Sequence, residues 1–103
     1  MKVEWLRTAL KNLDDEARYI AKDNPHAAAC FVKAIKASVE QLSQFPSMGH
    51  EGRLPGTREW PLPNLPYVIP YRIRLGKLQV LRIFHTRRLP PNTWQNACPQ
   101  NFQ

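Results

Sequence analysis

The chain has 103 residues, of which 43% are hydrophobic, so we expect one folded domain rather than a disordered or multidomain protein. No apolar run approaches the roughly 20 residues that span a bilayer. Residues 1–5 also lack the apolar stretch of a signal peptide, and we therefore expect a cytoplasmic protein without membrane contact. The formal net charge of +7 favours an anionic partner, either nucleic acid or an acidic protein segment, although the same charge can serve solubility alone.

The positive charge is concentrated in the second half of the chain. Residues 1–46 carry seven Lys or Arg against six Asp or Glu, whereas residues 47–103 carry eight against two. Apart from Lys77, these later cations are all arginines, namely Arg53, Arg58, Arg72, Arg74, Arg82, Arg87 and Arg88. Guanidinium groups bind phosphate and carboxylate groups bidentately, so we expect the functional surface to lie in this half.

Metal and cofactor chemistry have no support in the sequence. His26, His50 and His85 are isolated from one another and from the two cysteines, Cys30 and Cys98, so no metal-ligand spacing appears. Neither cysteine has a CxxC partner, and in a reducing compartment both are expected to be free thiols. There is no glycine-rich phosphate loop. We therefore predict no metal and no cofactor.

The first secondary-structure elements are a short strand and a helix. Residues 2–5 alternate polar and apolar side chains, which is typical of a strand. Apolar residues then recur at steps of three and four, which predicts an amphipathic helix. Thr8 is a candidate cap for this helix, and the pattern ends near Lys22 or Asp23.

A second helix follows almost at once. Asn24 is a strong N-cap, and Pro25 suits the first helical position because its missing N–H would have no intrahelical partner there. Apolar spacing continues until Pro46 and Gly49 end the helix. Such a short connection makes the two helices antiparallel.

The second half has the pattern of an antiparallel sheet. Three β-like stretches occupy residues 53–62, 66–74 and 78–85, and the last two are joined by a turn at 75–77. The middle stretch alternates, with Tyr67, Ile69, Tyr71 and Ile73 on one face and Val68, Pro70, Arg72 and Arg74 on the other. We expect the apolar face to cover the helices and the arginine face to point outward. The last stretch has apolar residues on both faces, which predicts a central strand.

The fold class that follows is α+β, with an N-terminal strand and an antiparallel two-helix hairpin packed on an antiparallel sheet. Pro70 requires either a bulge or a missing N–H that points away from a neighbouring strand. We assign residues 1–90 to one domain and residues 91–103 to a tail without charged side chains.

Two polar clusters are candidates for chemistry. Residues 56–59 read Gly-Thr-Arg-Glu at the start of one strand, and residues 85–88 read His-Thr-Arg-Arg at the end of another. If Arg72 lies between them, these groups include the components that RNA cleavage needs. These are a base, an acid and arginines that stabilise the phosphorane transition state. The structural alternative is that Glu59 forms a salt bridge at a sheet edge and His85 ends a strand with a hydrogen bond.

Four segments match one family in the right order. They read VEWLRTALKNLDDEARYIAKDNPHAA, LSQFPSMGHEGRLPGTREW, PYVIPYRI and LQVLRIFHTRRLP. The chain thereby resembles the RelE/ParE superfamily of toxins from type II toxin–antitoxin modules over roughly residues 3–90. The resemblance implies a curved sheet and a role in plasmid stabilisation. It also implies that a cognate, acidic antitoxin neutralises the toxin. The toxin would then contact operator DNA only through this antitoxin.

The positions that match the family's active region are Arg58, Glu59, Arg72, His85, Arg87 and Arg88, with Arg53, Arg74 and Arg82 as a supporting basic surface. RelE-type members are ribosome-dependent mRNA endonucleases, whereas ParE-type members inhibit DNA gyrase. No tyrosine follows Tyr71, and the PYVIPYR and HTRR segments resemble the ParE branch, so we expect a gyrase inhibitor.

Two alternatives stay open at this point. The first is a ribosome-dependent endonuclease that arrests translation, with Glu59 or His85 as the base and Arg72 or Arg88 on the phosphate. The second is a member that only binds its antitoxin and tunes repression of the operon.

Overall fold

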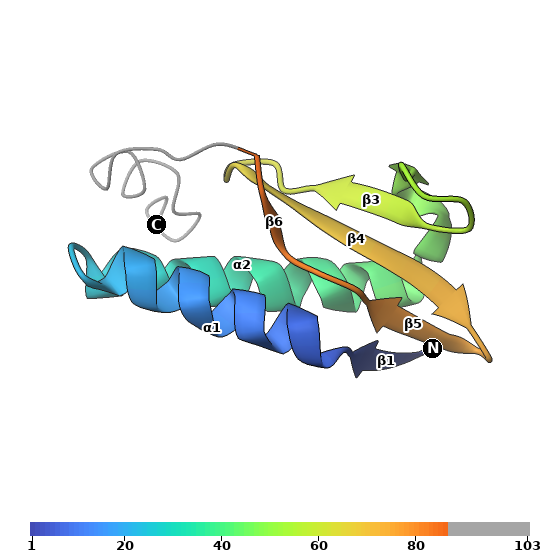
Figure 1. Ribbon diagram of the computed structural model, residues 1–103, viewed down its shortest axis with the longest axis horizontal. Coiled ribbons are helices and arrows are strands. Elements are labelled where there is room, and N and C mark those ends of the chain that lie inside the picture. The colour runs from blue at the N-terminus through green and yellow to red at the C-terminus, as the bar shows by residue number, and fades with distance from the viewer. Residues whose placement is uncertain (87–103) are drawn as a thin grey trace.

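Two antiparallel helices cover one face of a sheet, and the N-terminal strand forms one edge of that sheet (Figure 1). The computed structural model describes residues 1–86. In chain order the elements are β1 (Lys2–Trp5), α1 (Arg7–Ala21), α2 (Pro25–Gln44), the short 3-10 helix η1 (Pro46–Met48), β2 (His50–Glu51), β3 (Arg58–Pro61), β4 (Tyr67–Arg74), β5 (Lys77–Val80) and β6 (Phe84–His85). The predicted α+β fold is confirmed; the domain end at residue 90 and the tail at 91–103 lie outside the described residues.

The helical hairpin follows the predicted pattern except at its first cap. Asn24 Oδ1 accepts a hydrogen bond from the Ala27 N–H at 3.0 Å, and Pro25 occupies the first position of α2. The predicted cap at Thr8 is wrong, because α1 already begins at Arg7 with Leu6 before it and no side-chain cap. The Leu6 N–H instead donates to the Val80 carbonyl at 3.1 Å, so the β1–β5 ladder continues up to the helix.

The six-stranded sheet has the order β1-β5-β4-β3-β2, and β6 pairs with the start of β4. Its pairings are antiparallel with one exception, since β1 runs parallel to β5. A parallel pair needs a long crossover connection, and the two helices are part of that connection. The expected antiparallel sheet is therefore mixed at this edge.

The predicted strand at 78–85 is interrupted. β5 ends at Val80 and β6 begins at Phe84, and the Leu81 N–H donates to the Pro70 carbonyl at 2.9 Å. The N–H and C=O of a strand residue point to the same side, so the missing N–H of Pro70 faces this interruption. Pro70 is thus accommodated without a shift of register, and Arg72 keeps the face that the alternation predicts.

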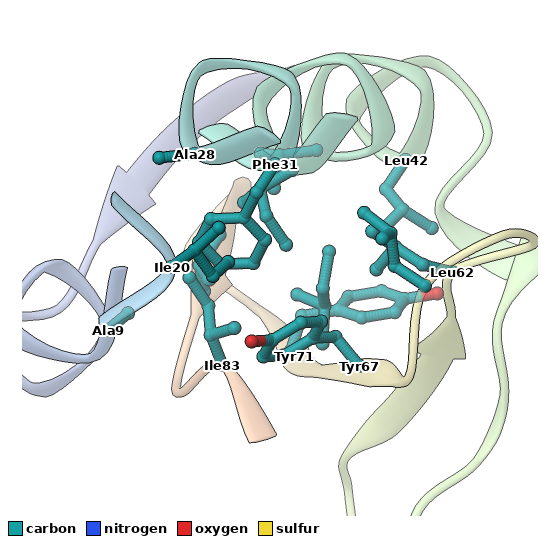
Figure 2. Packing of buried hydrophobic residues seen from close by; sticks show 14 of the residues in the cluster. Ala9, Ile20, Ala28, Phe31, Leu42, Leu62, Tyr67, Tyr71 and Ile83 are labelled. Carbon is teal, nitrogen blue, oxygen red and sulfur yellow. The ribbon is translucent and has the colours of Figure 1, made fainter. Parts of the chain in front are cut away.

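The core lies between the helices and the apolar face of β4. Tyr67, Ile69 and Tyr71 are fully buried there, and Figure 2 shows both tyrosine rings among side chains from α1 and α2 such as Ile20 and Phe31. The two tyrosines also anchor the layers by hydrogen bonds. The Tyr67 hydroxyl donates to Glu16 Oε1 at 2.9 Å on α1.

The Tyr71 hydroxyl makes two bonds at the end of α2. It donates to the Pro46 carbonyl at 2.6 Å and accepts from the Gly49 N–H at 3.0 Å. A Cβ added to Gly49 would lie only 2.5 Å from this hydroxyl, so the close approach requires glycine.

Cys30 differs from the sequence prediction. It is buried on α2 with its sulfur in a disulfide, so the expectation of a free thiol is wrong at this position. Spacing along the sequence does not reveal such a bond, because the pairing depends on which segments the fold brings together. Cys98 lies outside the described residues.

Neither helix of the described chain is long and apolar enough to cross a bilayer.

Replacing Tyr71 by Phe removes both hydrogen bonds while keeping the ring. Because the Gly49 N–H and the Pro46 carbonyl would then lack this partner, we expect the free energy of unfolding to fall by about 1–3 kcal/mol at pH 7. Urea denaturation followed by circular dichroism measures this loss. An unchanged midpoint and slope would show that the hydroxyl does not anchor η1.

The same variant tests the ionisation of Tyr71. Burial raises the pKa of Tyr71 above its ordinary value of 10.0, while the Gly49 hydrogen bond and the Arg58 charge act in the lowering direction. The unfolded tyrosine therefore loses its proton first, so its stabilising contribution is complete below the ordinary pKa and declines above it. We expect the stability difference between wild type and Tyr71→Phe to narrow above that pH; parallel curves would contradict this.

Candidate functional site

The face of the sheet turned away from the helices, called the outer face below, carries a chain of hydrogen bonds across three strands. Arg72 lies opposite Gln79, and Gln79 lies opposite Glu4. Arg72 Nε donates to Gln79 Oε1 at 2.6 Å, and Gln79 Nε2 donates to Glu4 Oε1 at 2.7 Å. Within residues 1–86, Arg72 thus keeps its terminal nitrogens for a ligand, and a guanidinium held this way suits a carboxylate or a phosphate.

A groove of about 480 Å³ lies on the same face, between the 52–57 loop and the segment around β6. Phe84 is central to it. The guanidinium carbons of Arg53 and Arg82 lie 5.0 and 5.8 Å from the centre of the Phe84 ring. The groove wall is completed by apolar and polar side chains, namely Thr8, Leu54, Thr57, Glu59, Pro70 and Leu81. The combination of an apolar floor and two arginines suits a ligand that is both apolar and anionic.

Glu59 holds the loop that forms one wall of the groove. Its Oε2 accepts from the Arg53 backbone N–H at 3.3 Å and lies 3.7 Å from Arg53 Nε. The Glu59 side chain is only 14% exposed, whereas that of Arg53 is 70% exposed. Glu59 therefore acts as an anchor for Arg53, and its ion-pair partner lies in the 52–57 loop.

Two of the predicted site residues face the other way. Arg58 lies opposite Tyr71, on the helix side of the sheet, and its Nη1 donates to the Gly49 carbonyl at 2.6 Å. His85 lies opposite Tyr67, and the two rings meet edge to face with centroids 4.7 Å apart. Arg58 thus connects β3 to the segment around η1, and His85 packs on the buried ring of Tyr67.

The predicted cluster is therefore divided by the sheet. Glu59, Arg72 and Arg74 lie on the outer face. Arg58 and His85 lie on the helix side. Arg87 and Arg88 lie outside the described residues. Residues 1–86 contain no group of three His, Cys, Asp or Glu that could hold a metal ion.

Sequence reasoning missed three residues of this face. Glu4 and Gln79 depend on the parallel pairing of β1 with β5, for which the sequence has no local signal. Phe84 could have been found, because it alternates with His85 and so faces the opposite side of the sheet.

Comparison with known proteins identifies the family. A family model described as "ParE toxin of type II toxin-antitoxin system, parDE" matches residues 3–90. The chain is 39% identical over 90 residues to "Putative toxin Y4kP" of Sinorhizobium fredii, covering 87% of this chain and 93% of that protein. It is 30% identical over 88 residues to "Toxin RelE2" of Caulobacter vibrioides, covering 85% and 98%.

The fold agrees with a solved structure as well. A chain of "Chromosomal ParDE TA system from P. aeruginosa" superposes with a TM-score of 0.76 at 29% identity, covering 84% of this chain and 97% of that one. The helical hairpin, the sheet and these matches together define a toxin of a type II toxin–antitoxin system. More specifically, the chain belongs to the ParE toxin family within the RelE/ParE superfamily. Membership implies an antitoxin as a partner.

Replacing Glu59 by Ala should release the groove wall. Since the Arg53 N–H loses its acceptor, we expect a loss of about 0.5–1.5 kcal/mol of stability and faster amide hydrogen exchange in residues 52–57. Asp15→Ala is the matched control, because it removes only the exposed 3.1 Å pair with Lys11 and should change stability by less than about 0.5 kcal/mol. Equal exchange rates in wild type and Glu59→Ala would refute the anchoring role.

Proposed function

We propose that this toxin acts by binding and inhibiting DNA gyrase through the outer face of its sheet. ParE-type toxins, which the sequence resembles, have this target. The single observation that carries the proposal is that neither candidate base is available beside Arg72, since His85 lies on the other side of the sheet and Glu59 is engaged with Arg53. RNA cleavage requires a base and phosphate-binding arginines around one phosphodiester.

The contacts of the candidate bases favour binding over cleavage. His85 is packed edge to face against Tyr67 on the helix side, and the Glu59 carboxylate is engaged with Arg53. By contrast, Arg72 is oriented by Gln79 on an open face, and Arg53 and Arg82 flank an apolar groove. Oriented arginines beside an apolar surface are typical of protein–protein interfaces.

A supercoiling assay with purified toxin and gyrase on relaxed plasmid tests the proposal. We expect inhibition by the wild type. The double variant Arg53→Ala/Arg82→Ala should require at least about tenfold more toxin for the same inhibition, since central arginines dominate binding energies. The charge-matched control is Lys33→Ala/Lys36→Ala on α2, which should inhibit like the wild type.

Unchanged supercoiling at excess wild-type toxin would refute gyrase as the target. The endonuclease alternative agrees with the match to "Toxin RelE2" and is tested by a separate measurement. Primer extension on translated messages after induction would then show new cleavage sites, whereas a gyrase inhibitor leaves these messages intact.

A further inference from the structure

Three cations from neighbouring strands lie side by side on the outer face, next to the turn between β4 and β5. Arg74 lies directly opposite Lys77, and Lys77 lies directly opposite Lys2. Residues in register share a face, and like charges in this position repel one another. The ion pairs within residues 1–86 are Lys11–Asp15, Arg18–Asp14 and Arg53–Glu59, so none of the three cations is neutralised there.

The turn itself contains a residue that local structure disfavours. Leu75 and Gly76 both have positive φ, 54° and 74°. Such two-residue turns favour Asn, Asp or Gly at both positions, because a side chain branched like that of leucine is strained in this region. Leu75 is 90% exposed, so its side chain gains no packing within the described chain to offset the strain.

The opposite side of the same turn is apolar. Ile73 belongs to the helix-facing side of β4, yet it is 43% exposed, whereas Tyr71 before it is fully buried. The end of β4 therefore is not covered by the helices. Figure 1 shows the turn between β4 and β5 beyond the ends of α1 and α2. The hairpin tip, defined as residues 73–77 with Lys2, has cations on one face and apolar side chains on the other face and at its apex.

We propose that the hairpin tip is a contact surface for the toxin's target, and that it takes an acidic protein surface with an apolar hollow for Leu75. The inference rests on the proposed function, in which this protein target is gyrase. Uncompensated charge, backbone strain and an exposed leucine at one position are features that a fold tolerates where a partner relieves them.

An acidic protein surface matches the tip better than nucleic acid does. A phosphate backbone would neutralise Lys2, Arg74 and Lys77 but would leave the apolar side of the tip in water. A protein cleft can place carboxylates against the cations and apolar side chains against Ile73 and Leu75 together. The two-sided character of the tip therefore favours a protein partner.

Two variants test the tip because they should improve the fold while removing the contact. Leu75→Asn relieves the strained φ, and Lys77→Glu replaces repulsion by attraction to Lys2 and Arg74. We expect both to have an unfolding midpoint at or above that of the wild type. Both should nevertheless need at least about tenfold more toxin to inhibit supercoiling, as loss of an interface anchor does, and both should lose growth arrest in cells without antitoxin.

Matched controls are Leu10→Gln, at an exposed leucine of α1, and Lys36→Glu on α2; both should arrest growth like the wild type. Full growth arrest by Leu75→Asn and Lys77→Glu would overturn the inference, whatever the target. If wild-type toxin fails to inhibit gyrase, the proposed function fails, while loss of growth arrest in the tip variants still supports the tip as the contact surface.

Binding to a fluorescent 20-base-pair DNA duplex completes the test. We expect wild type and Lys77→Glu to bind it equally weakly in fluorescence anisotropy. Tight duplex binding that Lys77→Glu abolishes would assign the tip to nucleic acid and overturn the protein partner.

Discussion

The alternation of β4 determines which side chains form the core and which form the outer face. Its odd-numbered side chains enter the core, where Tyr67 and Tyr71 donate hydrogen bonds to Glu16 and to the Pro46 carbonyl. A shift of one residue would expose these tyrosines and bury Arg72, so the register is strongly determined. The outer face thereby receives its arginine as a consequence of how the core is built.

Much of the fold could be predicted because its signals are local. The Asn24 cap, the Pro25 start and the alternation of β4 each depend on neighbouring residues, and the structure confirms them. The parallel pairing of β1 with β5 and the interruption at residues 81–83 could not be predicted, since they depend on segments distant in the sequence. The cap at Thr8 failed because the ladder bond of Leu6 starts the helix earlier.

The candidate site was predicted by residue type but only partly by position. Arg72 reaches the outer face as expected, yet Arg58 and His85 follow the strand parity of Tyr71 and Tyr67 and so lie on the helix side. The pairing register of β3 and β6 with β4 determines the face on which Arg58 and His85 lie. The spacing of residues along the sequence does not determine this register. The division places Arg58 and His85 on the helix side and leaves the terminal nitrogens of Arg72 on the outer face for a partner.

Two single variants, measured for growth arrest and for stability, distinguish the outer face from the helix side. Growth arrest and unfolding midpoint are compared for Arg72→Ala and Arg58→Ala at matched amounts of folded toxin. Both variants lose a 2.6 Å hydrogen bond, Arg72→Ala to Gln79 Oε1 and Arg58→Ala to the Gly49 carbonyl, so both midpoints should fall. We predict that folded Arg72→Ala nevertheless loses growth arrest, whereas folded Arg58→Ala retains it. Full arrest by Arg72→Ala together with loss of arrest in folded Arg58→Ala would contradict this prediction.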